Sequence, residues 1–186
     1  MADKKPKADT SWITDDLLDA LAWAESSWDP TAESKSGAMG LYQFMPRFYK
    51  EGEPLGYKVP TGAFDATNPV IARERAKAYL EGMQNYYPTW DPTEVLMAYN
   101  WGPGMVNKYK SGNLNLEEYA NESEWKRQKL AEAMNYAPKV LKALKEQPWT
   151  DLVERGQLVH IRDLLDRGEP AVYELLDADP FESTIK

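Results

Sequence analysis

The sequence predicts a mostly α-helical protein, and three observations lead to this prediction. In several segments apolar residues recur every three or four positions, which is the period of a helix with one buried face. These segments begin with residues that cap helices, and two of the caps are followed directly by proline, which favours the first helical position. No segment of comparable length alternates between apolar and polar residues as a strand would. We therefore expect a helical domain without a large sheet.

The composition fits one globular domain and excludes several classes of site. The 186 residues are 42% hydrophobic and 28% charged, values near the globular average, and they suffice for a full core. With 22 basic and 30 acidic residues the formal net charge is -8, which argues against nucleic acid as the main partner. The chain has no cysteine and one histidine, His160, so we expect neither a metal site nor another cofactor. His160 itself fits a helix surface or a satisfied interior position.

The N-terminal residues 1–11 are expected to form a flexible tail. This region is charged and no apolar segment follows it, so we expect no secretory signal peptide. No apolar stretch approaches the length needed to cross a bilayer. We therefore expect a protein that is made in a cytoplasm and needs another carrier for any action outside it.

The first helix is expected to begin after Thr14 and to end near Asp29-Pro30. Thr14 can cap its N-terminus, and Asp15 and Asp16 lie in the first turn, at the positive end of the helix dipole. The apolar residues that follow at helical spacing share one face with Glu25. They are Leu17, Leu18, Leu21 and Ala22.

A long active-site loop region and two capped helices are expected next. Residues 31–67 hold many Gly, Pro and Ser without a sustained period, so we expect a loop with short helical pieces. Asn68-Pro69 then begins a helix with one apolar face. Asp91-Pro92 begins another, in which Glu94 can complete a capping box, and Gly102-Pro103-Gly104 should end it.

The remaining residues also read as helices. A long helix is predicted over residues 122–146, with a kink at Pro138. Residues 149–180 fit two shorter helices separated by Gly168-Glu169-Pro170.

Glu25 is a candidate general acid. Leu17 and Leu21 precede it by eight and four residues, which places its side chain on the apolar face, and it falls in the last turn of the helix, where the dipole is negative. Burial and the dipole both disfavour a carboxylate, so both should raise the pKa of Glu25. A carboxyl group that stays protonated near neutral pH can donate to a leaving oxygen. The local helix is equally compatible with an ordinary exposed glutamate at a fraying helix end.

The glycine-containing loop after Glu25 offers groups that suit a sugar. Gly37 and Gly40 permit positive φ and a close approach of the backbone to a ligand. Gln43 supplies hydrogen-bond donors and acceptors, and Met45 supplies an apolar contact, as an N-acetylated sugar requires. The alternative is a tight turn that packs its apolar side chains into the core.

Four blocks of the sequence resemble the lytic transglycosylase (SLT) family, which has the goose-type lysozyme-like fold. In chain order they are Glu25-Ser26; Ser34-x-x-Gly37-Ala38-x-Gly40-Leu41-x-Gln43-x-Met45-Pro46; Ala98-Tyr99-Asn100-x-Gly102-Pro103-Gly104; and Glu132-x-x-x-Tyr136-x-x-Lys139-Val140-Leu141. One block alone would be a weak match, but the order and spacing of all four agree with the family. The resemblance implies a lysozyme-like helical domain, which we expect over residues 12–147, and leaves residues 148–186 as a helical C-terminal extension of unknown role.

The resemblance also implies roles for individual residues. Glu25 would be the sole catalytic acid/base, Tyr99 would position the acid or the intermediate, and Tyr136 would face the same cleft from the long helix. The residues implied to bind substrate or support that cleft are Ser34, Gly40, Gln43, Met45, Ala98, Asn100 and Glu132. For the two tyrosines, core packing is the alternative role.

The reaction that the resemblance implies is cleavage of the β-1,4 bond between MurNAc and GlcNAc of peptidoglycan. The 6-hydroxyl of the same sugar would attack and form 1,6-anhydroMurNAc, so the second carboxylate of ordinary glycosidases would be unnecessary. A hydrolytic muramidase acting on the same bond is the alternative, with a second carboxylate among Asp29, Glu33, Glu51, Glu53 and Asp65. The other alternative is a non-enzymatic virion or sugar-binding protein with a degenerate site, although the intact set of implied residues argues against it.

The expected lack of targeting signals suits a bacteriophage protein. Such a protein would act on the cell wall, either as a virion component during DNA entry or as a lysis enzyme released through a holin. The expected partners are peptidoglycan glycan strands and, for a virion component, other virion proteins, with no nucleic acid and no membrane span. The C-terminal extension could pack on the domain, dock on a virion or bind the wall.

Overall fold

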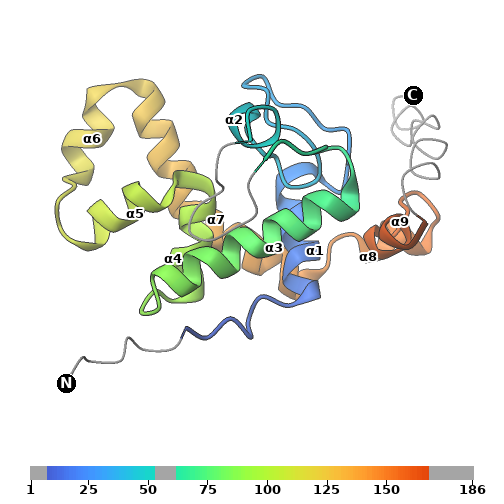
Figure 1. Cartoon of the computed structure of the whole chain (residues 1–186). Helices are drawn as coiled ribbons and strands as arrows, with labels where there is room; N and C mark the ends of the chain where they lie inside the picture. Colours follow the sequence, from blue (N-terminus) through green and yellow to red (C-terminus); the bar gives the residue numbers. More distant parts are fainter. Residues whose placement is uncertain (1–7, 53–61, 168–186) are drawn as a thin grey trace.

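A computed structural model of the chain describes residues 8–52 and 62–167, and it confirms the helical fold (Figure 1). In chain order the helices are α1 (Asp15–Ser26), α2 (Pro46–Tyr49), α3 (Pro69–Tyr86), α4 (Pro92–Trp101), α5 (Pro103–Lys110), α6 (Leu116–Glu122), α7 (Glu124–Glu146), α8 (Thr150–Glu154) and α9 (Ile161–Arg167). In the described residues, extended pairing is confined to isolated bridges in the loop after α1. The short α2 is the one helical piece in the described part of that loop.

The start of α1 is as predicted, and its end comes earlier. The Thr14 side chain accepts a hydrogen bond from the Leu17 N–H at 3.2 Å. The helix stops at Ser26 because Ser27 takes a left-handed backbone conformation, with φ of 55°. Trp28 follows with φ of 68°, a conformation that is costly for a bulky residue. Its indole holds it in place, since it is 2% exposed and donates from Nε1 to the Asp19 carbonyl at 2.8 Å.

The two proline-initiated helices α3 and α4 begin where the sequence predicts. The Asn68 side chain accepts hydrogen bonds from two N–H groups in the first turn of α3. Asp91 and Glu94 form the complete capping box of α4, in which each side chain bonds the other residue's backbone N–H. Gly102 ends α4 with φ of 89°.

Two helices after α4 were not predicted, although their signals are present in the sequence. Gly102-Pro103-Gly104 ends α4 as expected, but Pro103 is also the first residue of α5, a position that proline favours. Asn115 caps α6 by accepting hydrogen bonds from Glu117 and Glu118. The predicted long helix is present as α7, and the helix continues through Pro138.

The described part of the C-terminal extension differs from the prediction. The predicted break at Gly168-Glu169-Pro170 lies outside the described residues. Two helices, α8 and α9, already precede it, separated by residues 155–160. Both ends of this segment pack on the domain: the ring centroid of Trp149 lies 4.7 Å from that of Trp28, and Ile161 is fully buried in the same core.

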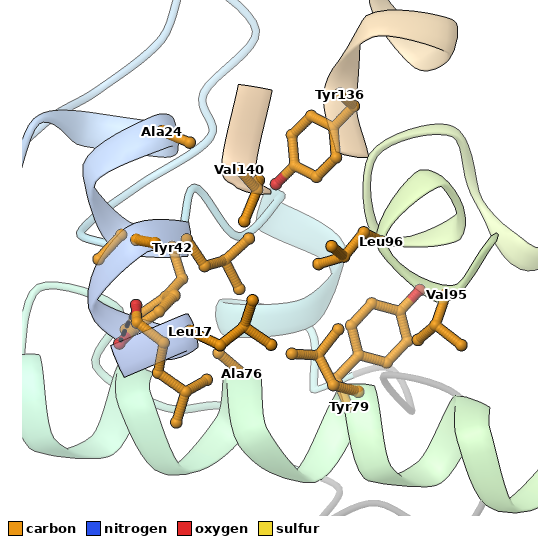
Figure 2. Close-up of a cluster of buried hydrophobic side chains, with 14 of the residues drawn as sticks. Leu17, Ala24, Tyr42, Ala76, Tyr79, Val95, Leu96, Tyr136 and Val140 are labelled. Atoms are coloured by element: carbon orange, nitrogen blue, oxygen red, sulfur yellow. Dashed lines mark hydrogen bonds between the residues drawn. The ribbon is translucent and has the colours of Figure 1, made fainter. Parts of the chain in front are cut away.

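The long helix α7 organises the core. It packs against α1, α4 and α6, and its middle therefore lies beside the C-terminal turn of α1 (Figure 1). Figure 2 shows this region, with Tyr136 and Val140 of α7 close to Leu96 of α4 in the buried cluster. This packing brings together residues that are separated by about one hundred positions in the sequence, and the candidate site lies at this junction.

The described residues show neither a membrane-spanning helix nor a cluster of metal-binding side chains. None of their helices combines the length and apolar character needed to cross a bilayer. The described residues also hold no group of three or more His, Cys, Asp or Glu that could bind a metal ion.

Candidate active site

The candidate site centres on Glu25 and Tyr136. Glu25 is half-buried in the last turn of α1, and Tyr136, which is 4% exposed, faces it from the middle of α7. The Tyr136 hydroxyl donates a short hydrogen bond to Oε1 of Glu25. Two of the residues that the resemblance assigns to catalysis are therefore in direct contact, although they are 111 positions apart in the sequence.

Burial raises the pKa of Glu25 to about 7. The hydrogen bond from Tyr136 and the positive charge of Lys139 act in the opposite direction, and the charge of Glu132 adds to the increase. The increase predicted from the buried helix face is thus confirmed, with burial as its main cause. Glu25 exchanges its proton near neutral pH, as a residue that acts first as an acid and then as a base requires.

Tyr136 remains a hydrogen-bond donor near neutral pH. Burial, followed by the charge of Glu25, holds the pKa of its hydroxyl well above the usual range. The same is true of Tyr99, whose pKa is raised by burial and by Glu25. Neither hydroxyl is therefore suited to act as a base near neutral pH.

Tyr99 supports the site through its ring. Its hydroxyl donates to the Tyr42 carbonyl at 2.9 Å, which ties α4 to the loop after α1. Its ring lies nearly parallel to that of Tyr136, with the centroids 6.3 Å apart and an interplanar angle of 10°. In this arrangement the ring of Tyr99 lies beside that of Tyr136, while its hydroxyl is bonded to Tyr42 rather than to Glu25.

Glu132 and Asn100 form a second polar contact one turn of α7 from Tyr136. Asn100 Nδ2 donates to Glu132 Oε1 at 2.9 Å, and Lys129 Nζ lies 2.7 Å from Oε2. Despite partial burial, these two hydrogen bonds lower the pKa of Glu132. Glu132 is therefore ionised at the pH at which Glu25 gains its proton. The buried Oδ1 of Asn100 has no hydrogen-bond partner in the described residues.

Of the three predicted residues of the loop, Ser34 and Gln43 form hydrogen bonds that hold its shape. The Ser34 hydroxyl accepts from the Ala38 N–H at 2.9 Å. Gln43 Nε2 donates to the carbonyls of Gly40 and Ala32 at 2.9 and 3.1 Å, while its Oε1 has no bond to a described residue. Met45 is 37% exposed at the start of α2. Roles of these three residues in substrate binding remain predictions.

Two of the residues that the resemblance implies to bind substrate are buried. Ala98 of α4 is completely buried, and its side chain belongs to the core cluster. Gly40 is also buried and has φ of 79°. A Cβ atom on Gly40 would lie 1.8 Å from the Ala66 carbonyl oxygen, so the close approach that this glycine permits is to the protein's own backbone rather than to a sugar.

Two hollows lie beside Asn100, and Glu25 lines neither of them. The smaller, of about 170 Å³, lies between the start of α2, α3 and the end of α4 and includes Tyr79 and Tyr99 in its lining. The larger, of about 800 Å³, is bounded by α5, α6 and the start of α7. Both are lined by Met45, Arg47, Asn100 and Trp101, so the two hollows adjoin each other.

Sequence reasoning missed two residues that shape the site. Lys139 donates from Nζ to the Ala24 carbonyl, at the negative end of α1, and lowers the pKa of Glu25. Its position three residues after Tyr136, on the same face of α7, was the available signal. Trp101 lines both hollows with a buried Nε1 that has no partner in the described residues. Its position directly after Asn100 was the corresponding signal.

Comparison with known proteins agrees with this arrangement. Residues 5–122, more than half of the chain, match the family described as Transglycosylase SLT domain. The chain belongs to this family. The SLT match includes Glu25, the glycine-containing loop and Tyr99, and it ends at the boundary between α6 and α7.

Two SLT relatives illustrate the similarity and its extent. Over 114 residues, 61% of this chain and 8% of the relative, the sequence is 36% identical to the peptidoglycan transglycosylase gp16 of Escherichia phage T7. Over 93 residues, 47% of this chain and 17% of the relative, it is 33% identical to the membrane-bound lytic murein transglycosylase F of Aeromonas salmonicida. The chain thus matches less than a fifth of the length of either relative. No solved structure matches this SLT domain.

Proposed function

We propose that this SLT domain is a peptidoglycan lytic transglycosylase that cleaves the β-1,4 bond between MurNAc and GlcNAc and forms 1,6-anhydroMurNAc. The observation that carries the proposal is the carboxyl group of Glu25, whose pKa is raised to about 7 and whose position is held by the Tyr136 hydroxyl. The printed names of the two relatives, both transglycosylases, support the same reaction.

In the first step Glu25 acts as the acid. The Tyr136 hydroxyl donates to Oε1, which leaves the proton of the neutral carboxyl group on Oε2, free to be transferred. That proton passes to the glycosidic oxygen as its bond to C1 of MurNAc breaks. The carbonyl oxygen of the sugar's own N-acetyl group stabilises the positive charge that develops at C1.

In the second step Glu25 acts as the base. The 6-hydroxyl of the same MurNAc bonds to C1, and the Glu25 carboxylate takes its proton, which closes the 1,6-anhydro ring and restores the acid. No water is consumed, and the two proton transfers balance. A pKa near 7 suits both steps, because the two protonation states of Glu25 are then close in free energy.

Hydrolysis by a muramidase is the competing proposal and requires a second carboxylate. Of the candidates in the loop, Asp29 and Asp65 each accept hydrogen bonds from the backbone and hydroxyl of a threonine two residues on, which is the pattern of a turn. Glu132 acts electrostatically on Glu25, but it is bonded to Asn100 and Lys129. Both observations favour a reaction in which the substrate supplies the nucleophile.

The same proposal assigns substrate contacts and a biological setting. Gln43 Oε1, Met45 and Asn100 would contact the sugars, with Glu132 orienting Asn100 and Ser34 holding the loop. The similarity to a protein of phage T7 supports a phage origin and action on the host wall, as a virion component or as a lysis enzyme. We further propose that the catalytic unit extends beyond residue 147 to include α8 and α9, since Trp149 and Ile161 belong to its core.

The test is digestion of purified peptidoglycan followed by mass analysis of the muropeptides. Anhydro ends are expected from the wild type, and Glu25→Gln should lower their release by about 10³-fold with the fold intact. Glu33→Gln, which alters an exposed carboxylate in the loop after α1, should retain activity. Reducing ends in place of anhydro ends would instead support a muramidase, and full activity of Glu25→Gln would refute the assignment of the acid.

A further inference from the structure

The larger hollow differs in charge from the rest of the protein. It is lined by four cationic side chains, Arg47, Lys108, Lys126 and Lys129, and by one carboxylate, Glu122. The whole chain has the opposite balance, with 22 basic and 30 acidic residues. A groove of positive charge in an acidic protein favours an anionic ligand and raises its local concentration.

The lysines that line this groove differ in whether they already pair with a protein carboxylate. Lys126 pairs with Glu122 and lies over the ring of Tyr119, and Lys129 pairs with Glu132. Lys108, in contrast, is exposed on α5 and has no ion-pair partner among the described residues. A peptide carboxylate can therefore bind Lys108 without first displacing a protein carboxylate.

The groove also offers an apolar surface beside these charges. Trp125, at the start of α7, is 62% exposed and lines it together with Tyr119, Met105 and Leu114. Such a large exposed indole at the edge of a hollow is typical of a binding surface. At about 800 Å³ the hollow can hold a short peptide segment.

The groove lies next to the candidate active site, because Asn100 lines it and bonds Glu132, one turn of α7 from Tyr136. Asn100, Trp101, Met45 and Arg47 line both this hollow and the smaller one beside Tyr99. A substituent on a sugar bound near Glu25 can therefore extend past Asn100 into the lobe formed by α5, α6 and α7 (Figure 1). Trp125, Lys126 and Lys129 lie beyond the residues that match the SLT family, so this wall of the groove belongs to the rest of the chain.

We propose that the groove between α5, α6 and α7 binds the acidic stem peptide carried by MurNAc, with Lys108 receiving a peptide carboxylate and Trp125 contacting the peptide's apolar atoms. This inference rests on the proposed peptidoglycan substrate. Neutral glycan is disfavoured as the occupant, because the polar side chains along the groove are mainly amines rather than the paired donors and acceptors that sugar hydroxyls need.

The test compares two substrates that differ only in the peptide. One is a set of glycan strands with intact stem peptides, and the other is the same strands after the peptides have been removed with an amidase. The measured quantity is kcat/KM for the release of anhydro ends. Lys108→Glu should lower kcat/KM on the peptide-bearing strands by about tenfold, since it replaces attraction by repulsion, and change that on the bare strands by less than about twofold.

Two further variants separate charge from packing. Trp125→Ala should show the same selective loss, and because this indole is 62% exposed the variant should fold normally. Lys77→Glu makes the same change of charge at an exposed residue of α3 that lines neither hollow. It should leave kcat/KM unchanged on both substrates. Higher salt should reduce the wild-type preference for peptide-bearing strands.

The outcomes are distinct. An equal loss on both substrates for Lys108→Glu and Trp125→Ala would overturn the proposal and assign the groove to the glycan. No loss on either substrate would also overturn it. Absence of anhydro ends from both kinds of strand with the wild-type protein would contradict the proposed reaction itself, independently of the groove.

Discussion

Glu25 is held between two opposing influences. Burial favours its neutral form, while the Tyr136 hydroxyl and the Lys139 ammonium favour its carboxylate, and the balance leaves its pKa at about 7. A single residue can serve as both acid and base only when neither form is strongly preferred. The neighbours of Glu25 therefore matter for its function as much as its own identity.

The first prediction concerns pH. Because the reaction begins with protonated Glu25, wild-type activity should fall as the pH rises through about 7. Tyr136→Phe removes a hydrogen bond that stabilises the carboxylate, so the pKa of Glu25 should rise and this fall should move to higher pH. Its maximal rate should drop about tenfold to a hundredfold, because the carboxyl group loses its fixed orientation. Measurement of kcat against pH tests both effects, and an unchanged or lower midpoint in Tyr136→Phe would contradict the contact.

At the scale of elements, Asp19 of α1 forms ion pairs with two other helices. This carboxylate is 3% exposed and lies 2.7 Å from Nη1 of Arg73 on α3 and 2.9 Å from Nε of Arg162 on α9. Arg73 also donates to the Tyr42 hydroxyl at 3.2 Å, and the carbonyl of Tyr42 accepts from Tyr99. The helix that carries Glu25 is thus linked both to the C-terminal extension and to the loop of the site.

The second prediction tests this connection. Arg162→Ala leaves one oxygen of a buried carboxylate without its partner, and we expect a loss of about 1–2 kcal/mol in the free energy of unfolding. Arg155→Ala is the matched control, since Arg155 pairs with Asp151 on the surface, where both side chains are more than two thirds exposed. That control should cost less than about 0.5 kcal/mol. Urea denaturation followed by circular dichroism measures both, and equal effects would show that α9 does not stabilise α1.

At the scale of the whole molecule, the core crosses the predicted boundary at residue 147. Trp149 lies against Trp28 and Trp23, with ring centroids 4.7 and 5.7 Å apart, and the centroid of His160 lies 5.1 Å from that of Trp28. Trp28 is the residue that takes a left-handed conformation three positions after Glu25. The described part of the extension therefore packs against the end of α1, the helix that carries Glu25.

The third prediction follows from this packing. Trp149 is 5% exposed, so Trp149→Ala should lower the free energy of unfolding by about 3–5 kcal/mol, a large share of the stability of a domain of this size. Trp125→Ala removes the same side chain from an exposed position and should cost less than about 0.5 kcal/mol. Thermal unfolding of the two variants provides the comparison, and a Trp149→Ala variant as stable as the wild type would mean that residues 148–167 are separable from the domain.

The sequence by itself determined the helices with strong local signals and the candidate for the acid. The caps at Thr14, Asn68 and Asp91 act within one turn, so they can be recognised without knowledge of the fold. The same holds for the apolar face that buries Glu25 and raises its pKa. The helices α5 and α6 were missed because Pro103 was interpreted only as part of a stop signal and because the cap at Asn115 precedes a short helix.

Only the tertiary structure decided which side chains meet. Glu25 and Tyr136 are 111 residues apart, and their contact depends on α7 packing against both α1 and α4. The burial of Gly40 and Ala98, the basic groove beside Trp125 and the docking of α9 on Asp19 arise in the same way. Periodicity shows which face of a helix is buried, but the residue that covers this face comes from elsewhere in the chain and is set by the packing of the whole core.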